Sequence, residues 1–205
     1  MRELEAMNRH FIREKETLAD LARASSNVPF RSRPDLPKMA EWPAARNATD
    51  ILMIGQNLYL IFRQWKFFEE KLRQKCRLRL LMADPRNEDL IDTMSRGVVE
   101  QSYTKADFTP VFDTIYKLRN ALPPEDQSRI DLRVMDYVPS LSFQVVDGGL
   151  PSGVMIIELA PNKMEVLARP HVMLLASEQS HRDWYEKFAR NCEAMFDCAA
   201  PWPWP

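Results

Sequence analysis

The residues best suited to acid–base or nucleophilic chemistry are few and widely spaced. Three cysteines without a paired spacing, and with no histidine near Cys192 or Cys198 in the sequence, indicate neither a disulfide framework nor a zinc site. His171 is expected at a sheet edge, from which an imidazole could reach a binding or catalytic site. The complete set is His10, His171, His181, Cys76, Cys192 and Cys198.

The common catalytic motifs are missing from this sequence. Five glycines are too few and too scattered for a nucleotide-binding loop. Neither a serine between paired glycines nor a His-Glu-x-x-His motif occurs. The chain therefore contains no complete catalytic motif, and we expect no metal and no cofactor.

The composition of the chain excludes several classes of protein. A chain of 205 residues with 45% hydrophobic residues can bury one core of ordinary size. Its net charge of -1 gives no overall attraction to nucleic acid or anionic membranes. No apolar run approaches the roughly 18 residues of a membrane span, and the first residues lack the apolar core of a secretory signal. We expect a cytoplasmic protein.

Four segments follow from the patterning of the chain. Residues 1–24 carry an apolar stripe at three- and four-residue steps, which predicts an N-terminal helix that forms a short coiled coil or packs on its own domain. Prolines crowd residues 25–45 and predict a linker, or an irregular strap that Val28, Phe30, Met39 and Trp42 hold against the domain. Residues 46–200 form an α/β domain. Residues 201–205 alternate proline and tryptophan, which favours an extended tail that docks on its own domain or on a partner.

Within residues 46–200, short apolar runs alternate with segments of helical period. The runs at 50–55 and 78–82 are continuous, as in strands buried on both faces, and are separated by a helix over 58–72. We predict a mixed, mostly parallel sheet with helices on both faces. The remaining predicted elements are helices from residues 87 and 109, strands near 130–135, 141–146, 154–158 and 172–175, and a last helix over 184–196.

Several local features together resemble one half of a phospholipase-D-like fold. They are a buried strand ending at Gly55, a Trp/Phe-rich helix, and a strand followed by Asp84-Pro85. A late strand pair across Asp147-Gly148, the pair Arg169-Pro170 and a closing aromatic helix complete the likeness, which extends over residues 49–202. Such domains occur in bacterial regulators and signalling proteins. The resemblance implies a homodimer, because one half of that fold pairs with a second half.

The same resemblance implies a lost activity. Active members of the superfamily carry His-x-Lys-x-x-x-x-Asp, in which the histidine attacks phosphorus and the lysine holds the phosphate. In this chain Ser140 and Ser142 occupy the histidine and lysine positions, and Asp147 occupies the last. We therefore expect a non-catalytic module that senses a ligand or binds a protein in a bacterial regulatory, defence or signalling system. The alternative is a divergent phosphodiesterase or nuclease that uses Asp147, His171 and Arg169.

A ligand site is expected where the late strands meet the loops after the first two strands. Hydroxyls, amides and one arginine there suit a nucleotide- or phosphate-bearing ligand. Simpler interpretations stay open: Asp84 starts a turn, Asp147-Gly148 is a hairpin turn, and Arg169 pairs with a carboxylate such as Glu158. A protein partner of the N-terminal helix or the tail is a third hypothesis. The candidate ligand-binding residues are Gln56, Asp84, Ser140, Ser142, Gln144, Asp147, Arg169 and His171.

Overall fold

The computed structural model describes residues 30–32, 34, 38–97, 104–160, 164–165 and 168–204. The predicted N-terminal helix, residues 1–24, lies outside this described part of the chain. Within the described ranges, no helix is both long and apolar enough to cross a lipid bilayer.

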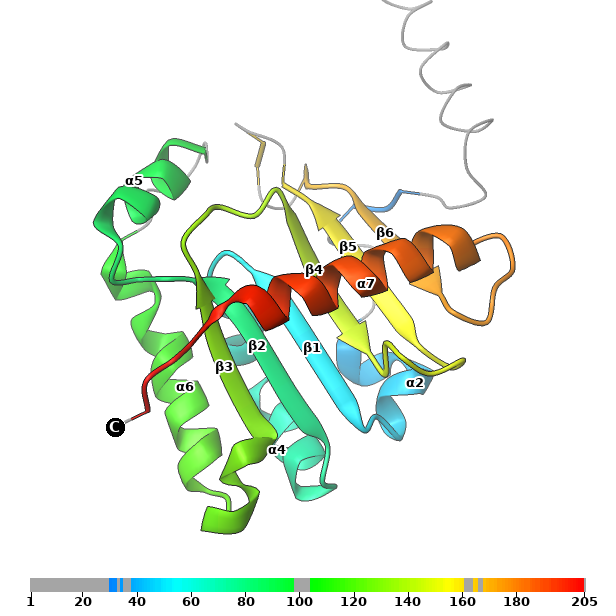
Figure 1. The fold of residues 1–205 in the computed structure, drawn as a ribbon, viewed down its shortest axis with the longest axis horizontal. Helices are drawn as coiled ribbons and strands as arrows, with labels where there is room; N and C mark the ends of the chain where they lie inside the picture. The colour runs from blue at the N-terminus through cyan, green and yellow to red at the C-terminus, as the bar shows by residue number, and fades with distance from the viewer. Residues whose placement is uncertain are drawn as a thin grey trace, which may run out of the picture.

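The described strands form one seven-stranded sheet in the order β6-β5-β4-β1-β2-β3-β7 (Figure 1). Only the pairs β1–β2 and β2–β3 are parallel; β1–β4, β3–β7, β4–β5 and β5–β6 are antiparallel. The expected α/β class with a mixed sheet is confirmed, but the expectation of a mostly parallel sheet is wrong. The bounds are β1 Asp50–Gly55, β2 Arg77–Ala83, β3 Ile130–Met135, β4 Leu141–Val146, β5 Val154–Leu159, β6 His171–Leu175 and β7 Ala200–Pro201.

Connection length explains this error. A parallel pair needs a crossover of a dozen residues or more, and such crossovers join β1 to β2 and β2 to β3. The later strands follow one another through residues 136–140, 147–153 and 160–170, each shorter than the roughly twelve residues that a parallel crossover needs, and β4, β5 and β6 form an antiparallel meander. The meander then attaches through β4 to the free edge of β1.

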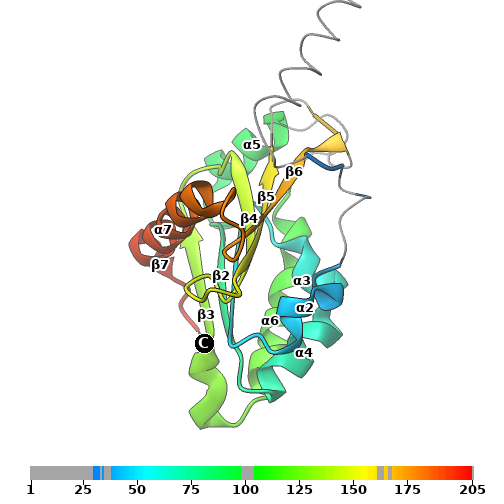
Figure 2. The ribbon, with the colours of Figure 1, turned by 90° about the vertical axis from the view of Figure 1, so that its right-hand side faces the viewer.

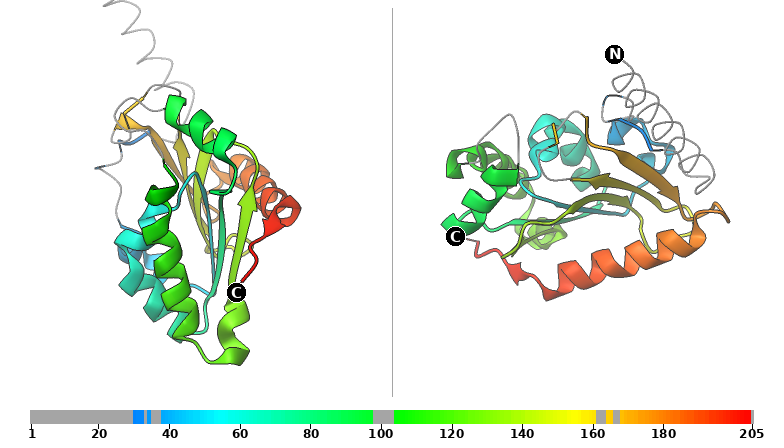
Figure 3. Two further views of the ribbon diagram at one scale, coloured as in Figure 1. Left: turned by 90° about the vertical axis from the view of Figure 1, so that its left-hand side faces the viewer. Right: turned by 90° about the horizontal axis from the view of Figure 1, so that it is seen from above.

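Helices lie against the two faces of the sheet. Figures 2 and 3 show α2, α3, α4 and α6 on one face and α7 crossing the other. The predicted helix over 58–72 is two helices, which meet at Gln64. The bounds are α2 Pro43–Arg46, α3 Tyr59–Arg63, α4 Trp65–Arg73, α5 Glu88–Gly97, α6 Thr109–Asn120 and α7 Arg182–Cys198, with short 3-10 turns η2 Met39–Glu41, η3 Lys105–Asp107 and η4 Pro124–Arg129.

One hydrophobic core lies on each face of the central strand, β1. Met53 of β1 faces the larger core beneath α3, α4 and α6, whereas its neighbours Leu52 and Ile54 face the smaller core beneath α7. All three are almost fully buried, as the continuous apolar run predicts. Tyr185, Cys192 and Phe196 supply the buried side of α7.

Part of the proline-rich segment belongs to the packed unit. Met39 and Trp42 are 1% and 3% exposed, and Ala45 is also buried in the larger core. The packed unit therefore already includes Met39, ahead of the boundary expected near residue 45. Phe30, in contrast, is 57% exposed.

The C-terminal tail packs on its own domain. Pro201 pairs with Arg133 at the edge of β3, and the Trp202 backbone N–H donates to the Leu132 carbonyl at 2.8 Å. The Trp202 indole lies 4.5 Å from the Phe112 ring of α6, between ring centroids, and its N–H donates to the Tyr116 hydroxyl. Of the two docking modes considered for the tail, the structure has the intramolecular one.

Gly153 marks a tight approach between the β4–β5 turn and α7. A Cβ at this position would lie 2.1 Å from the Tyr185 hydroxyl and 2.7 Å from the Asp147 carbonyl oxygen. Because one of these atoms is backbone, the clash cannot be relieved by a rotamer change. We expect Gly153→Ala to lower the free energy of unfolding by about 1–3 kcal/mol. Urea denaturation measures this loss; Gly149→Ala, where no atom lies within 4 Å of the new Cβ, is the matched control.

Candidate functional site

The predicted site residues lie toward one end of the sheet, with Gln144 midway along β4 opposite Met53, and with one exception at the opposite end. Gln56 and Asp84 follow β1 and β2, and Ser140 precedes β4. Strand register then aligns the meander with them: His171 pairs with Glu158, and Glu158 pairs with Ser142. The carboxyl ends of β1 and β2 therefore adjoin the start of β4, the end of β5 and the start of β6 (Figure 1).

The side chains of Ser142 and Gln144, which we call the polar row, point to the face that carries α3, α4 and α6. Ser142 and Gln144 alternate with Phe143, which belongs to the core beneath α7. Gly55 is the neighbour of Ser142 across the β1–β4 pair: a Cβ on Gly55 would lie 3.4 Å from the Ser142 Oγ. The same Cβ would lie 3.3 Å from Leu58 Cδ2, so Gly55 allows β1, Ser142 and Leu58 to approach closely.

A buried charged group stands at the β5–β6 end of the row. Arg169 Nη1 donates to Glu158 Oε1 at 3.0 Å, and His171 Nε2 lies 2.8 Å from Glu158 Oε2. His171 Nδ1 lies 2.8 Å from the Arg169 carbonyl oxygen. All three residues are no more than 6% exposed. The pairing of Arg169 with Glu158, one of the two interpretations of this arginine, is therefore present.

This geometry holds the imidazole of His171 in place. A carbonyl oxygen only accepts, so Nδ1 carries a hydrogen and is not available as a base. Nε2 faces a carboxylate oxygen. The His171 backbone is also engaged, because its N–H and carbonyl exchange 2.8 Å hydrogen bonds with Arg31.

Three uncharged polar side chains at the same end keep hydrogen-bonding capacity. Ser142 and Gln144 are half-buried and make no side-chain hydrogen bond to any residue that the structure describes. Gln56 Oε1 is buried and likewise lacks a partner among the described residues. Buried polar atoms usually have partners, so these groups are candidates for contact with a ligand.

The loop after β1 contains an unusual backbone conformation. Leu58 has φ 51°, in the left-handed region, although its side chain is buried. For a residue with a Cβ this conformation costs on the order of 1 kcal/mol, and such residues are enriched at binding sites. Leu58 lies two positions after Gln56, directly at the end of the sheet where the polar row is found.

Asp84 is committed to a turn. Its carboxylate accepts hydrogen bonds from the Arg86 backbone N–H at 2.9 Å and from the Arg86 guanidinium. The Arg86 side chain is the main reason why the pKa of Asp84 is lowered. The Arg86 guanidinium also contacts the C-terminal tail, because it lies over the Trp202 ring.

Asp147 is the exception, and grouping it with the other candidates is wrong. It follows the last residue of β4, at the opposite end of the strand from Ser142, a separation of roughly 17 Å at the usual rise per residue. Its Oδ1 accepts hydrogen bonds from the backbone N–H groups of Thr49 and Asp50 and from the Thr49 hydroxyl. Asp147 therefore joins β4 to the start of β1, as a turn residue with φ 50°.

Three other potential nucleophiles, Cys76, Cys192 and Tyr185, are buried, whereas Cys198 is exposed. Desolvation raises the pKa of Cys76 and of Cys192 to about 12, and that of Tyr185 to about 12 as well. Thiols with such values remain protonated at neutral pH and are poor nucleophiles. No group of three potential metal ligands lies together within the described ranges.

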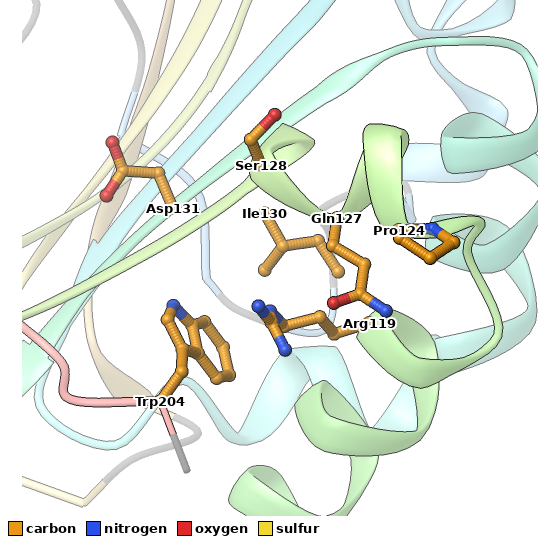
Figure 4. A pocket seen from close by; sticks show the side chains of 7 residues that line it. All are labelled: Arg119, Pro124, Gln127, Ser128, Ile130, Asp131 and Trp204. Carbon is orange, nitrogen blue, oxygen red and sulfur yellow. The ribbon is translucent and has the colours of Figure 1, made fainter.

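A separate hollow of about 420 Å³ lies at the other end of the sheet, between η4, α6 and the tail (Figure 4). The sequence analysis did not anticipate it, because it exists only once the tail has docked. The alternating prolines and tryptophans were its one sequence signal. Its lining residues are Arg119, Pro124, Gln127, Ser128, Ile130, Asp131 and Trp204.

Comparisons with known proteins leave the function open. No family model matches the chain, and no curated protein matches its sequence. Among solved structures, the archaeal chromatin protein TrmBL2, described as showing a novel mode of DNA binding, matches with a TM-score of 0.47 and 13% identity. The match covers 97% of this chain and 64% of TrmBL2. At this level of similarity the match carries no argument about function.

Proposed function

We propose that this chain is a non-catalytic ligand-sensing module that binds a nucleotide- or phosphate-bearing ligand at the polar end of its sheet. The observation that carries the proposal is the polar row of Ser142 and Gln144, together with Gln56. Ser142 and Gln144 retain donors and acceptors next to Glu158, whose charge is paired with Arg169, and Gln56 Oε1 in the loop after β1 has no partner among the described residues. Hydroxyls and amides donate to phosphate oxygens and to the polar edges of a base.

The charged group supports this function by holding the strands that carry the row. Glu158 bonds to both Arg169 and His171, which fixes the end of β5 against the start of β6. Site residues held in this way are pre-organised, which lowers the entropic cost of binding. A homodimer in a bacterial regulatory or defence and signalling system remains part of the proposal, from the phospholipase-D-like resemblance.

The enzymatic alternative fits the geometry less well. A phosphodiesterase that uses Asp147, His171 and Arg169 would need these side chains around one phosphorus atom. Asp147 instead lies beyond the opposite end of β4 and bonds to the start of β1. The ring of His171 is engaged at both nitrogens. Binding without turnover is therefore the better-supported function.

Two measurements test the proposal. Native mass spectrometry of the full chain reports its oligomeric state and any small molecule that co-purifies. Thermal shift with adenosine monophosphate and inorganic phosphate tests binding directly. We expect stabilisation that is lost in the Ser142→Ala/Gln144→Ala double variant and retained in Ser152→Ala, a serine of the β4–β5 turn at the other end of β4.

Catalysis provides the opposing outcome. With bis(p-nitrophenyl) phosphate as a generic phosphodiester we expect no turnover above background. Hydrolysis that disappears in His171→Ala would overturn the non-catalytic assignment. Binding unchanged in the Ser142/Gln144 double variant would instead overturn the location of the site.

A further inference from the structure

Arg119 is an arginine without an ionic partner. Its side chain, half-buried on α6, forms no salt bridge or hydrogen bond with any residue in the described part of the chain, and its buried Nε has no partner there. Two more deeply placed arginines each have a carboxylate partner: Arg79 binds Asp50 and Glu193, and Arg169 binds Glu158 through Nη1, although the Nε of Arg169 has no partner among the described residues. A cation removed from water without a partner is costly, so the unpaired guanidinium points to an anion that is supplied from outside.

The tail holds this guanidinium in position. Arg119 Cζ lies 4.6 Å from the Trp204 ring centroid, and the Tyr116 ring packs edge-on against the same indole at 5.5 Å. Trp204 is itself anchored two residues earlier, where Trp202 hydrogen-bonds to Leu132 and Tyr116. Stacking on an indole is a favourable contact for arginine and leaves the edge of its guanidinium able to donate hydrogen bonds.

The other charged group at the hollow is already neutralised. Asp131 Oδ1 and Oδ2 each lie 3.3 Å from a guanidinium nitrogen, of Arg133 and Arg77 respectively. Figure 4 shows the Trp204 indole, the Arg119 guanidinium and the Gln127 amide turned toward a common centre, whereas the Asp131 carboxylate points away from it. The uncompensated charge that remains at this centre is positive.

We propose that this hollow is a second binding site, which takes an oxyanion carried on a flat apolar ring. Arg119 would bind the carboxylate or phosphate, and Trp204, Pro124 and Ile130 would contact the ring. The volume of about 420 Å³ falls in the range of small-molecule sites. This site is independent of the polar row, because Ile130 and Asp131 lie at the start of β3, at the other end of the sheet.

The test uses the full chain and three probes that share one ring: benzoate, phenyl phosphate and the neutral amide benzamide. Binding is followed by the indole N–H cross-peak of Trp204 in a ¹H–¹⁵N spectrum, which is assigned by its absence in Trp204→Phe. We expect this cross-peak to shift with benzoate or phenyl phosphate, and the stronger of the two identifies carboxylate or phosphate as the natural group. Benzamide is expected to bind at least tenfold more weakly, because a charge-assisted hydrogen bond is lost.

Variants separate the site from general charge effects. Arg119→Gln is expected to weaken binding of the anion about tenfold or more, and Arg119→Lys by less, because it keeps the charge. Lys187→Gln is the matched control, since Lys187 lies 5.0 Å from an exposed indole, Trp184, elsewhere on the surface. The dispersion of each spectrum verifies folding. Equal affinity for benzamide and benzoate, no shift with either anion, or full binding by Arg119→Gln and Arg119→Lys would overturn the proposal.

Discussion

Glu158→Ala is expected to lower the free energy of unfolding by about 3–5 kcal/mol, the usual cost of removing one partner from a buried ion pair. The substitution leaves the Arg169 guanidinium, 5% exposed, without the carboxylate that accepts its Nη1 hydrogen bond. It also removes the acceptor that faces His171 Nε2. Urea denaturation followed by circular dichroism measures the loss.

A double variant distinguishes charge compensation from simple packing. Glu158→Leu/Arg169→Met removes both charges and keeps apolar bulk, so we expect much of the lost stability to return. The coupling between the two positions, obtained from Glu158→Leu, Arg169→Met and the double variant, should exceed about 1 kcal/mol. A Glu158→Ala protein within 1 kcal/mol of the parent would show that the pair contributes little to the fold.

Asp147→Ala is the second substitution with a large expected effect, about 2–3 kcal/mol of unfolding free energy. One carboxylate oxygen of the buried Asp147 serves two backbone N–H groups and the Thr49 hydroxyl. A donor left unsatisfied in a buried place costs about 1–3 kcal/mol, and water can replace part of this loss because Thr49 is exposed. Alanine also bears the steric cost of φ 50°, roughly 1 kcal/mol.

Two further substitutions at Asp147 divide this loss into its parts. Asparagine keeps an oxygen acceptor and tolerates the left-handed region, so Asp147→Asn should be the mildest. Glycine tolerates the backbone angle but cannot accept the hydrogen bonds, so Asp147→Gly should fall between asparagine and alanine. If glycine proved as mild as asparagine, the hydrogen bonds would not be the source of the stability.

The sequence predicts elements better than it predicts their pairing. The apolar run of β1 and the helical period of α7 arise from burial of particular residues, which a local pattern records. The attachment of the meander to the second edge of β1 pairs Ile51 with Val146, and these residues are too far apart in sequence for a local pattern to report it. The break at Gln64 is likewise not visible in the apolar spacing, because Ile61 and Phe68 both face the same core.

The candidate site was likewise predictable from the sequence only in part. That Ser142, Gln56 and His171 lie at one end follows from counting strands, and this part was predictable. The misplaced residue, Asp147, was assigned through a motif spacing, which specifies positions along one strand and not the neighbours across the sheet. The hollow at Arg119 was not predictable, because it requires the tail, α6 and β3 to meet.

The position of β1 has a consequence for how the chain is made. Its first partner, β2, leaves the ribosome soon after it, but its second edge waits for β4, and Thr49 and Asp147 are 98 positions apart. During that interval an edge rich in Ile, Leu and Met is open to pairing with other nascent chains. A chain whose synthesis stopped before β4 would be an aggregation-prone intermediate. The yield of soluble protein therefore depends on synthesis of the second half of the chain.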